Sequence, residues 1–250
     1  MMNHLRDALD TLAMIRGLGV EEILIAFSGG KDSLVTLDLC QRSGFALRPY
    51  FRYEVSGLSE HERVFEWVKR RYGCDVIRVP SPELASKIRF GAMLPRETEM
   101  KRNLRHVDVE NYLRQKTGLE WIASGIRMHE SLQRRGMVNS LSKKPCLTCT
   151  LPERIGIDRN GSRIWPICHW GPQHVRDYMR LRKLCEPVRT GMAKDRAMDL
   201  SLNAENLIYL RQHNPDDYRK MLQRFPLAEV LVKRWEIWNE ANTDTDPQEE

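Results

Sequence analysis

Apolar residues in the first half of the chain alternate between a helical spacing and short continuous runs. The helical spacing predicts an amphipathic helix over residues 1–20, and the Ile-rich run after it predicts a buried strand over residues 21–27. Further strands are predicted at 47–55, 74–80 and 119–125, and further helices at 34–44 and 59–73. The basic and polar residues 96–117 are also expected to be helical. Because strands that alternate with helices form parallel βαβ units, the pattern predicts an α/β fold with a doubly wound, mostly parallel sheet.

Two local signals predict where helices begin and end. Glu62 follows Ser59 by three residues, which is the spacing of a capping box at the start of the helix over 59–73. Gly44 comes directly after the last apolar residues of the helix over 34–44 and predicts a glycine C-cap.

The second half of the chain has a looser pattern. Gly, Pro, Ser and Lys are frequent in residues 136–164, which predicts a long surface excursion, and residues 163–170 predict a short extended segment. A helix is predicted over 171–185 with Pro172 near its first turn. Three shorter helices are predicted at 202–213, 216–225 and 227–242. We therefore expect one domain over residues 1–190, a small helical C-terminal segment over 191–242 and a disordered acidic tail over 243–250.

Composition narrows the class of protein. The chain has 250 residues, of which 41% are hydrophobic and 30% are charged, as in a globular protein with a substantial core. Its apolar runs are shorter than the roughly 18 residues that a membrane-spanning helix needs. Charged residues interrupt the N-terminal helix, unlike the apolar centre of a signal peptide. We therefore expect a cytoplasmic protein, without a disulfide framework and without a membrane partner.

The charge balance suits a partner that carries phosphate. Forty Lys and Arg against 34 Asp and Glu give a formal net charge of +6. A basic set within 96–105 could follow a nucleic-acid backbone, but a solvated helix face is the more common explanation, so nucleic acid is not the favoured partner. Its members are Arg96, Lys101, Arg102 and Arg105. The oligomeric state is left open.

The strongest chemical signal is the motif SGGKDS between a predicted strand and a predicted helix. It comprises Ser28, Gly29, Gly30, Lys31, Asp32 and Ser33. Paired glycines let backbone amides approach an anion closely, the helix N-terminus adds partial positive charge, and Lys31 adds a cation. The simpler alternative is a glycine turn followed by a helix cap. The complete strand–turn–helix context favours a phosphate site.

A second motif, GIRMHESLQR, begins where the strand over 119–125 ends. In open α/β sheets, ligands bind beyond the carboxyl ends of strands. Arg127 and Arg134 could clamp a phosphate or sulfate, with Glu130 fixing one of the two guanidinium groups. The alternative is a solvated, charged helix start. With the first motif upstream we favour an anion site formed by Gly125, Arg127, Glu130, Ser131 and Arg134.

These two motifs, followed by WPICHW at 165–170 with Val175 and Tyr178 after it, occur in an order that resembles a known family. The chain is similar to the PP-loop proteins of the adenine-nucleotide α-hydrolase-like superfamily, and within them to the phosphoadenylyl-sulfate (PAPS) reductase branch. The resemblance implies a small-molecule adenine nucleotide as ligand, ATP or adenylyl sulfate, with Mg²⁺ if it is ATP. It also implies that Lys31 and backbone donors stabilise charge near the α-phosphate.

The resemblance suggests two functions. The first is an enzyme that acts at the phosphate or sulfate end of the nucleotide, in ATP pyrophosphatase-type adenylyl transfer or in sulfonucleotide handling. The second is a nucleotide-responsive binding or regulatory protein that has lost catalysis. Sulfonucleotide reductases carry a C-terminal E-C-G-[IL]-H element, and nothing in residues 191–250 matches it. The G-C-x-x-C element of DNA-phosphorothioation relatives is missing as well.

The six cysteines fall into two groups. Cys40 and Cys74 lie in apolar patterns and are expected in the core. The other four suggest a zinc site or an iron–sulfur cluster, with a redox or persulfide-carrying pair as the second interpretation and ordinary residues as the third. They are Cys146, Cys149, Cys168 and Cys185.

Overall fold

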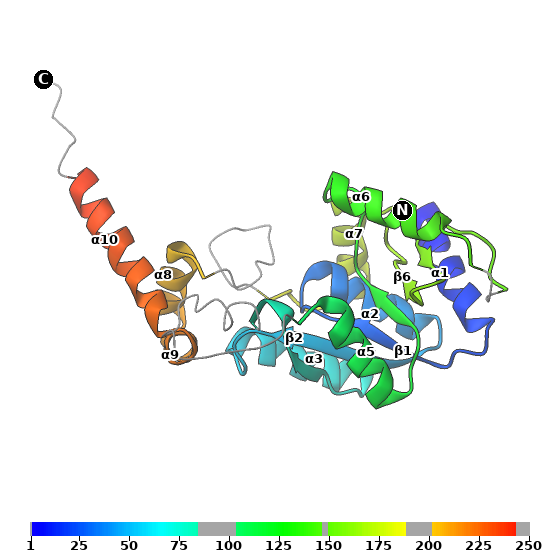
Figure 1. Cartoon of the computed structure of the whole chain (residues 1–250), viewed down its shortest axis with the longest axis horizontal. Coiled ribbons are helices and arrows are strands. Elements are labelled where there is room, and N and C mark those ends of the chain that lie inside the picture. Colours follow the sequence, from blue (N-terminus) through cyan, green and yellow to red (C-terminus); the bar gives the residue numbers. More distant parts are fainter. Residues whose placement is uncertain (1, 85–103, 147–149, 189–201, 244–250) are drawn as a thin grey trace, which may run out of the picture. The chain divides into compact units, whose positions relative to one another are not determined.

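Figure 1 shows the chain in a computed structural model, which describes residues 2–84, 104–146, 150–188 and 202–243. The chain divides into two compact units. Unit 1 comprises Met1–Arg52, Arg63–Val79 and Val107–Val188, and unit 2 comprises Tyr53–Glu62, Pro80–His106 and Arg189–Glu250. In the described part of the chain, no helix has the length and apolarity needed to cross a membrane.

A six-stranded sheet with the order β3-β2-β1-β4-β6-β5 organises unit 1. Strand β1 pairs in parallel with β2 and β4, and β4 pairs in parallel with β6, whereas the short β5 is antiparallel to β6. This confirms the predicted α/β class and mostly parallel sheet. The strands are β1 (Glu22–Ala26), β2 (Ala46–Tyr53), β3 (Ile77–Pro80), β4 (Ile122–Ser124), β5 (Ile157–Asp158) and β6 (Arg163–Ile164).

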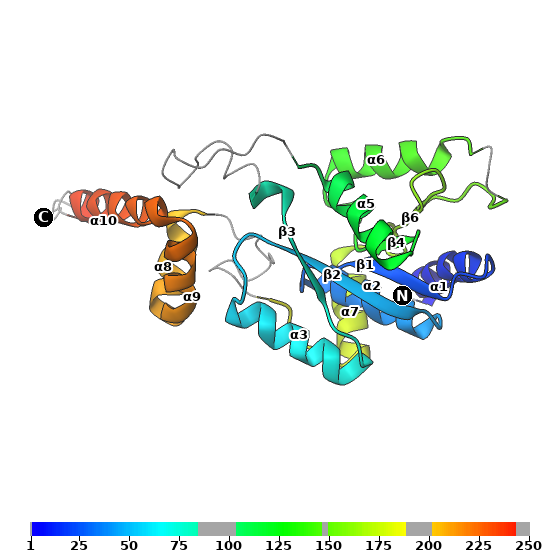
Figure 2. The ribbon, with the colours of Figure 1, turned by 60° about the horizontal axis from the view of Figure 1, so that its bottom comes forward.

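The alternation of side chains along β1 explains the two layers of helices (Figure 2). Ile23 and Ile25 join one buried apolar cluster, whereas Leu24 between them joins a second cluster on the opposite face. The first cluster takes in α1 (Met2–Arg16), α2 (Lys31–Arg42), α3 (Ser59–Tyr72) and α7 (Pro172–Arg182). The second takes in α5 (His106–Thr117). A strand buried on both faces is apolar throughout, as the sequence shows.

The chain leaves β1 toward β2 on one side and later returns to β4 on the other side. The order of the strands therefore reverses between β1 and β4. Loops that follow two such strands diverge and leave a crevice at the carboxyl edge of the sheet. The SGGKDS motif follows β1, and the GIRMHESLQR motif follows β4, so the fold brings both predicted motifs to this point.

Several predicted elements need correction. Residues 136–143 are not part of a surface excursion, because α6 (Leu132–Lys143) continues through them. The sequence did not indicate this helix because Gly136 is a poor helix former and the apolar face is weak, with Val138 as its buried apolar residue. Helix α5 begins at His106, and residues 96–103 of the predicted helix lie outside the described part, as do residues 244–250 of the predicted tail.

The two predicted helix signals have different outcomes. Gly44 has φ +82°, and its amide donates to the carbonyl of Gln41 at 3.0 Å, which confirms the glycine cap. The capping box is wrong. The helix α3 begins at Ser59, the amide of Glu62 donates to the carbonyl of Leu58, and the Ser59 hydroxyl donates to Asp217 at 2.9 Å.

Unit 2 contains the helices predicted for the C-terminal segment. They are α8 (Ala204–His213), α9 (Pro215–Arg224), the 3₁₀ helix η1 (Pro226–Ala228) and α10 (Glu229–Thr243). Their core includes Leu207, Phe225 and Val232, and Leu58 and Leu84 from the earlier segments of this unit pack in the same cluster. The buried carboxylate of Asp217 accepts hydrogen bonds from the Ser59 amide and hydroxyl, so it ties α9 to the first turn of α3.

A buried carboxylate on α2 holds three helices of unit 1 together. Asp38 is completely buried and accepts hydrogen bonds from the Tyr72 hydroxyl at 2.9 Å and the Tyr178 hydroxyl at 2.7 Å. The Arg182 Nε also donates to it at 2.9 Å. Burial alone would raise the pKa of Asp38, but the hydrogen bonds from Arg182, Tyr178 and Tyr72 outweigh it and hold the pKa below 3.8. This network joins α2, α3 and α7.

Candidate functional site

The SGGKDS loop forms a compact turn that leads directly into α2. Gly29 has φ +74°, a conformation that favours glycine, and Gly30 is the extended N-cap of α2. The Ser33 hydroxyl donates to the Gly30 carbonyl at 2.8 Å and accepts from the Ser28 amide at 3.3 Å. Ser33 thus closes the loop on itself, which fixes the path of the backbone around the helix N-terminus.

The helix N-terminus gives this loop its electrostatic character. The first four amides of a helix have no acceptor within the helix, and the hydrogen-bond ladder of α2 starts where Leu34 donates to Gly30 at 3.0 Å. Aligned peptide dipoles place about half a positive charge at this end. Lys31, the first residue of α2, adds a full positive charge there. The combination matches an anionic group.

Two glycines allow unusually close approaches beside the loop. A Cβ added to Gly29 would lie 2.6 Å from a methyl group of Val188, whose amide donates to the Gly29 carbonyl at 3.0 Å. A Cβ added to Gly125 would lie 2.7 Å from the backbone carbon and oxygen of Asp32. The end of β4 therefore rests directly on the first turn of α2, and only glycine fits there.

Arg127 joins the two motifs through ion pairs. Its side chain is 5% exposed, and its Nε lies 2.7 Å from Asp32 Oδ1, a pairing of charges whose angles fall outside hydrogen-bond geometry. A second guanidinium nitrogen donates to Asp32 Oδ2 and to Glu130 Oε1, at 3.3 Å each. In addition, the Arg127 amide donates to Glu130 at 3.2 Å. Arg127 thus lies between two carboxylates from different segments.

Burial and the neighbouring charges act in opposite directions on Asp32. Burial raises its pKa above 3.8, Glu130 adds to the rise, and Arg127 and Lys31 oppose it. The carboxylate is therefore held in a poorly solvated place by its pairing with Arg127. Removal of that guanidinium would leave a buried carboxylate without its main counter-charge.

The remaining residues of the second motif form ion pairs or cap helix α6. Glu130 also pairs with Arg134, so this carboxylate contacts both arginines that the sequence singles out. The Ser131 hydroxyl caps α6 by accepting the amide of Arg134 at 3.1 Å. Arg134 is more exposed than Arg127, with 47% of its side chain accessible. Anion binding by these residues stays a prediction.

Val188 lies beside the SGGKDS loop, which the sequence did not suggest. Val188 reaches the loop through a backbone hydrogen bond to Gly29, and its side chain fills the space beside that glycine. A valine in a segment without a motif carries no signal of such a role. Only the tertiary structure places it there.

The cysteines divide as follows. Cys40 is buried in the main cluster of unit 1 and Cys74 packs against it, as expected for core residues. Cys168 packs with Val138 and Trp165, whereas Cys185 packs against the main cluster. Among the described residues no three His, Cys, Asp or Glu side chains gather to hold a metal ion, and Cys149 lies outside the described part. The four-cysteine site therefore stays a prediction.

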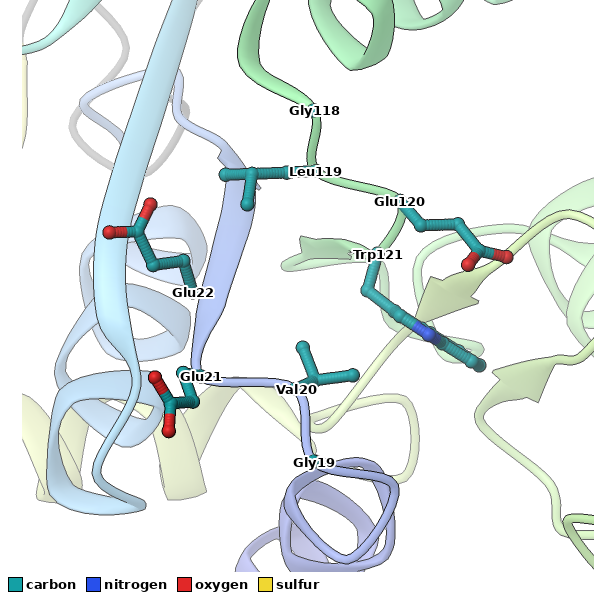
Figure 3. A pocket seen from close by; sticks show the side chains of 8 residues that line it. All are labelled: Gly19, Val20, Glu21, Glu22, Gly118, Leu119, Glu120 and Trp121. Atoms are coloured by element: carbon teal, nitrogen blue, oxygen red, sulfur yellow. The ribbon is translucent and has the colours of Figure 1, made fainter.

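A shallow hollow of about 370 Å³ lies at the opposite edge of the sheet (Figure 3). Its two lining segments, 19–22 and 118–121, precede or begin β1 and β4, whereas the two motifs follow these strands. Glu22 pairs with Arg48 at 3.1 Å, and Glu120 accepts from the Ser162 hydroxyl at 2.5 Å. The hollow is thus separate from the loop, and the carboxylates of Glu22 and Glu120 have structural partners.

The fold and the loop define an α/β protein of the PP-loop class. The family model of the phosphoadenosine phosphosulfate reductase domain matches residues 22–186, which include both motifs and the whole sheet. The chain belongs to this family.

The chain is similar to two solved structures, of which the first supports the fold. The U34-tRNA thiolase NcsA from Methanococcus maripaludis, solved with its 4Fe–4S cluster, is 18% identical with a TM-score of 0.50, over 91% of this chain and 78% of that one. A PAPS reductase from Candida auris, in a phosphate complex, is 15% identical with a TM-score of 0.44, over 71% of this chain and 81% of that one. A comparison with curated proteins finds no match.

Proposed function

We propose that unit 1 binds an adenine nucleotide, ATP or adenylyl sulfate, with its phosphate or sulfate end in the Ser28–Ser33 loop. The observation that carries this proposal is the position of the loop. It lies at the N-terminus of α2, beside the reversal of strand order, and combines a left-handed Gly29 with Lys31. Membership of the family supports an adenine nucleotide over other anions. Mg²⁺ would accompany ATP as a counter-ion of its phosphates.

The chemistry that we propose takes place at the same end of the nucleotide. In adenylyl transfer, an acceptor attacks the α-phosphorus and pyrophosphate leaves with the electron pair of the broken bond. Lys31 and the first amides of α2 would stabilise the negative charge that develops on the phosphate oxygens. Reduction of a sulfonucleotide by a C-terminal cysteine is not proposed, because residues 191–250 contain no cysteine.

A regulatory function is the second candidate. It is favoured by the state of Arg127, which is already paired with Asp32 and Glu130 and is almost fully buried. Such a protein would bind the nucleotide without turning it over. Release of pyrophosphate or AMP from ATP, measured with candidate acceptors, distinguishes the enzyme from the regulator.

A thermal-shift screen tests the binding proposal. ATP with Mg²⁺, PAPS, adenylyl sulfate and AMP are compared at equal concentration, with inorganic phosphate as the control. At least one nucleotide that carries a phosphate or sulfate beyond the α-phosphate should raise Tm, by an amount equivalent to about 2.7 kcal/mol at a hundredfold excess over Kd. Equal shifts with inorganic phosphate, or no shift with any nucleotide, would contradict the proposal.

The substitution Arg127→Lys tests the junction between the motifs. Lysine keeps the charge but cannot contact both Asp32 and Glu130 with a planar fork, so we expect a loss of about 1.5 kcal/mol or more in the free energy of unfolding. Because Asp32 lies in the loop, nucleotide affinity should fall as well. Urea unfolding and titration calorimetry measure the two effects.

The matched control for this prediction is Arg180→Lys. Arg180 forms an exposed pair with Asp177 at 3.2 Å, so its replacement should change stability by less than about 0.5 kcal/mol. If Arg127→Lys and Arg180→Lys behave alike, Arg127 contributes only its charge.

A further inference from the structure

The peptide group between Gly29 and Gly30 is held from outside the SGGKDS loop. The Gly30 carbonyl has partners nearby in the chain, because it accepts from the Ser33 hydroxyl at 2.8 Å and from the Leu34 amide at 3.0 Å. The Gly29 carbonyl instead accepts from the amide of Val188, at 3.0 Å. One peptide of the loop therefore depends on a distant residue that no motif contains.

The orientation of this peptide decides which group the loop presents. In a trans peptide, the carbonyl and the following N–H point in opposite directions. The bond from Val188 to Gly29 therefore turns the Gly30 N–H toward the inside of the turn, where the Ser28 hydroxyl oxygen lies 3.3 Å away. Because 3.3 Å is long for a hydrogen bond, a phosphate or sulfate oxygen would be a stronger acceptor for this N–H.

The two glycines also make this peptide easy to turn over. Rotation of the peptide plane changes ψ of Gly29 and φ of Gly30, and glycine restricts neither torsion. In the reversed orientation the Gly29 carbonyl oxygen would face the anion and repel it. A turn of this kind binds an anion through its N–H groups, so the loop needs the observed orientation to be held.

Val188 is itself firmly fixed. Its side chain is 5% exposed, and one of its methyl groups lies 2.6 Å from the position of a Cβ added to Gly29, so it packs directly on this glycine. The Arg63 guanidinium on α3 donates to the carbonyls of Glu186 and Pro187, at 3.2 and 3.4 Å. Pro187 restricts the backbone immediately before Val188. The Val188 amide is therefore in place before any ligand binds, which lowers the entropy cost of binding.

We propose that Val188 is a positioning residue of the nucleotide site. Its amide holds the Gly29–Gly30 peptide in the orientation that presents an N–H to the phosphate or sulfate group. This role rests on the proposed function, because it concerns the anion that the loop binds. Val188 contacts the loop and acts on the ligand only through it.

The substitution Val188→Pro tests this role, because proline has no N–H and keeps an apolar side chain. The ring carbon on its nitrogen also crowds the Gly29 carbonyl, which favours the reversed peptide. Titration calorimetry uses the nucleotide that gives the largest thermal shift. We expect Val188→Pro to raise Kd at least about tenfold. Val188→Ala keeps the N–H and loses only packing, so it should lower Tm but raise Kd less than about threefold.

The matched control is Val109→Ala. Val109 lies on α5 and is likewise 5% exposed, but it packs in the apolar cluster on the other face of the sheet. This substitution should lower Tm about as much as Val188→Ala and leave Kd unchanged. It therefore separates a loss of stability from a change at the loop. Far-UV circular dichroism checks that every variant is folded.

Nuclear magnetic resonance of the ¹⁵N-labelled parent protein tests the same role without any substitution. The nucleotide should shift the amide proton of Gly30 downfield, because this N–H donates to the anion. The amide of Val188 should exchange with solvent at least about tenfold more slowly in the complex, because the anion and Val188 favour the same orientation of the peptide. In folded Val188→Pro, the shift of Gly30 should be lost.

Three results would overturn the positioning role and leave the loop as the site. The first is a folded Val188→Pro that binds like the parent while Lys31→Ala binds more weakly. The second is a loss of affinity in Val188→Ala as large as that in Val188→Pro, which would assign the effect to packing. The third is a Gly30 amide in the parent that does not respond to the bound nucleotide. A parent protein that binds no nucleotide would contradict the proposed function, and the role of Val188 would fall with it.

Discussion

Replacement of Gly125 by alanine should cost several kcal/mol of stability and abolish nucleotide binding. The added Cβ would lie 2.7 Å from the backbone carbon and oxygen of Asp32, and neither atom can move without displacing the first turn of α2. Either β4 or the Ser28–Ser33 loop must therefore shift. Urea unfolding should show a loss of about 3 kcal/mol or more, at the upper end for a single substitution.

Gly136→Ala is the matched control. Gly136 lies inside α6, and a Cβ added there meets no atom within 4 Å. The same substitution should therefore raise stability by about 0.5–1 kcal/mol, because alanine loses less conformational freedom in a helix. Equal effects of the two substitutions would contradict the close approach of β4 to α2.

The second large effect is expected at Asp38, which lies on α2 beyond the SGGKDS motif and binds Tyr178 of the third segment. Asp38→Ala would leave the buried hydroxyls of Tyr72 and Tyr178 and the Arg182 guanidinium without their shared acceptor. We expect a loss of about 3–5 kcal/mol in the free energy of unfolding. The control Asp177→Ala, on the exposed side of α7, should cost less than about 1 kcal/mol.

The stability that Asp38 contributes should depend on pH, and the pKa of Asp38 gives the direction of that dependence. The folded pKa of Asp38 lies below its ordinary value of 3.8, so its contribution is fully present above pH 3.8. It is lost as the pH falls from 3.8 through the lowered folded pKa. The difference in stability between the parent protein and Asp38→Ala should therefore be constant from pH 5 to 7 and should shrink in more acidic solution. A difference that grows with acid would contradict the lowered pKa.

The periodic pattern predicted most of the main strands and helices of unit 1 because they have a strong apolar signal. Ile23, Leu24 and Ile25 are buried on both faces of the sheet, and the unbroken apolar run reports this directly. Helix α6 was missed because its apolar face is weak. Strand β5 has only two residues and gains its stability from pairing with β6, which no local pattern reveals.

The sequence likewise predicted only part of the candidate site. Gly29 follows from the motif, because the turn into α2 needs a left-handed backbone conformation at that position. The role of Gly125 as a contact for Asp32 depends on two segments 93 residues apart in the chain. Arg127 was predicted to face an anion, with Glu130 fixing one of the two arginines, and the structure pairs it with Glu130 and also with Asp32, whose proximity the sequence could not indicate.

The central claim is that the Ser28–Ser33 loop holds the charged end of an adenine nucleotide. Titration calorimetry of the parent protein and of Lys31→Ala, with the nucleotide that gives the largest thermal shift, tests it most directly. Lys116→Ala, which removes an exposed charge from the last turn of α5, is the control. We predict that Lys31→Ala raises Kd at least about tenfold, equivalent to 1.4 kcal/mol, with unfolding unchanged, and that Lys116→Ala binds like the parent. An identical Kd for Lys31→Ala and the parent would contradict the claim.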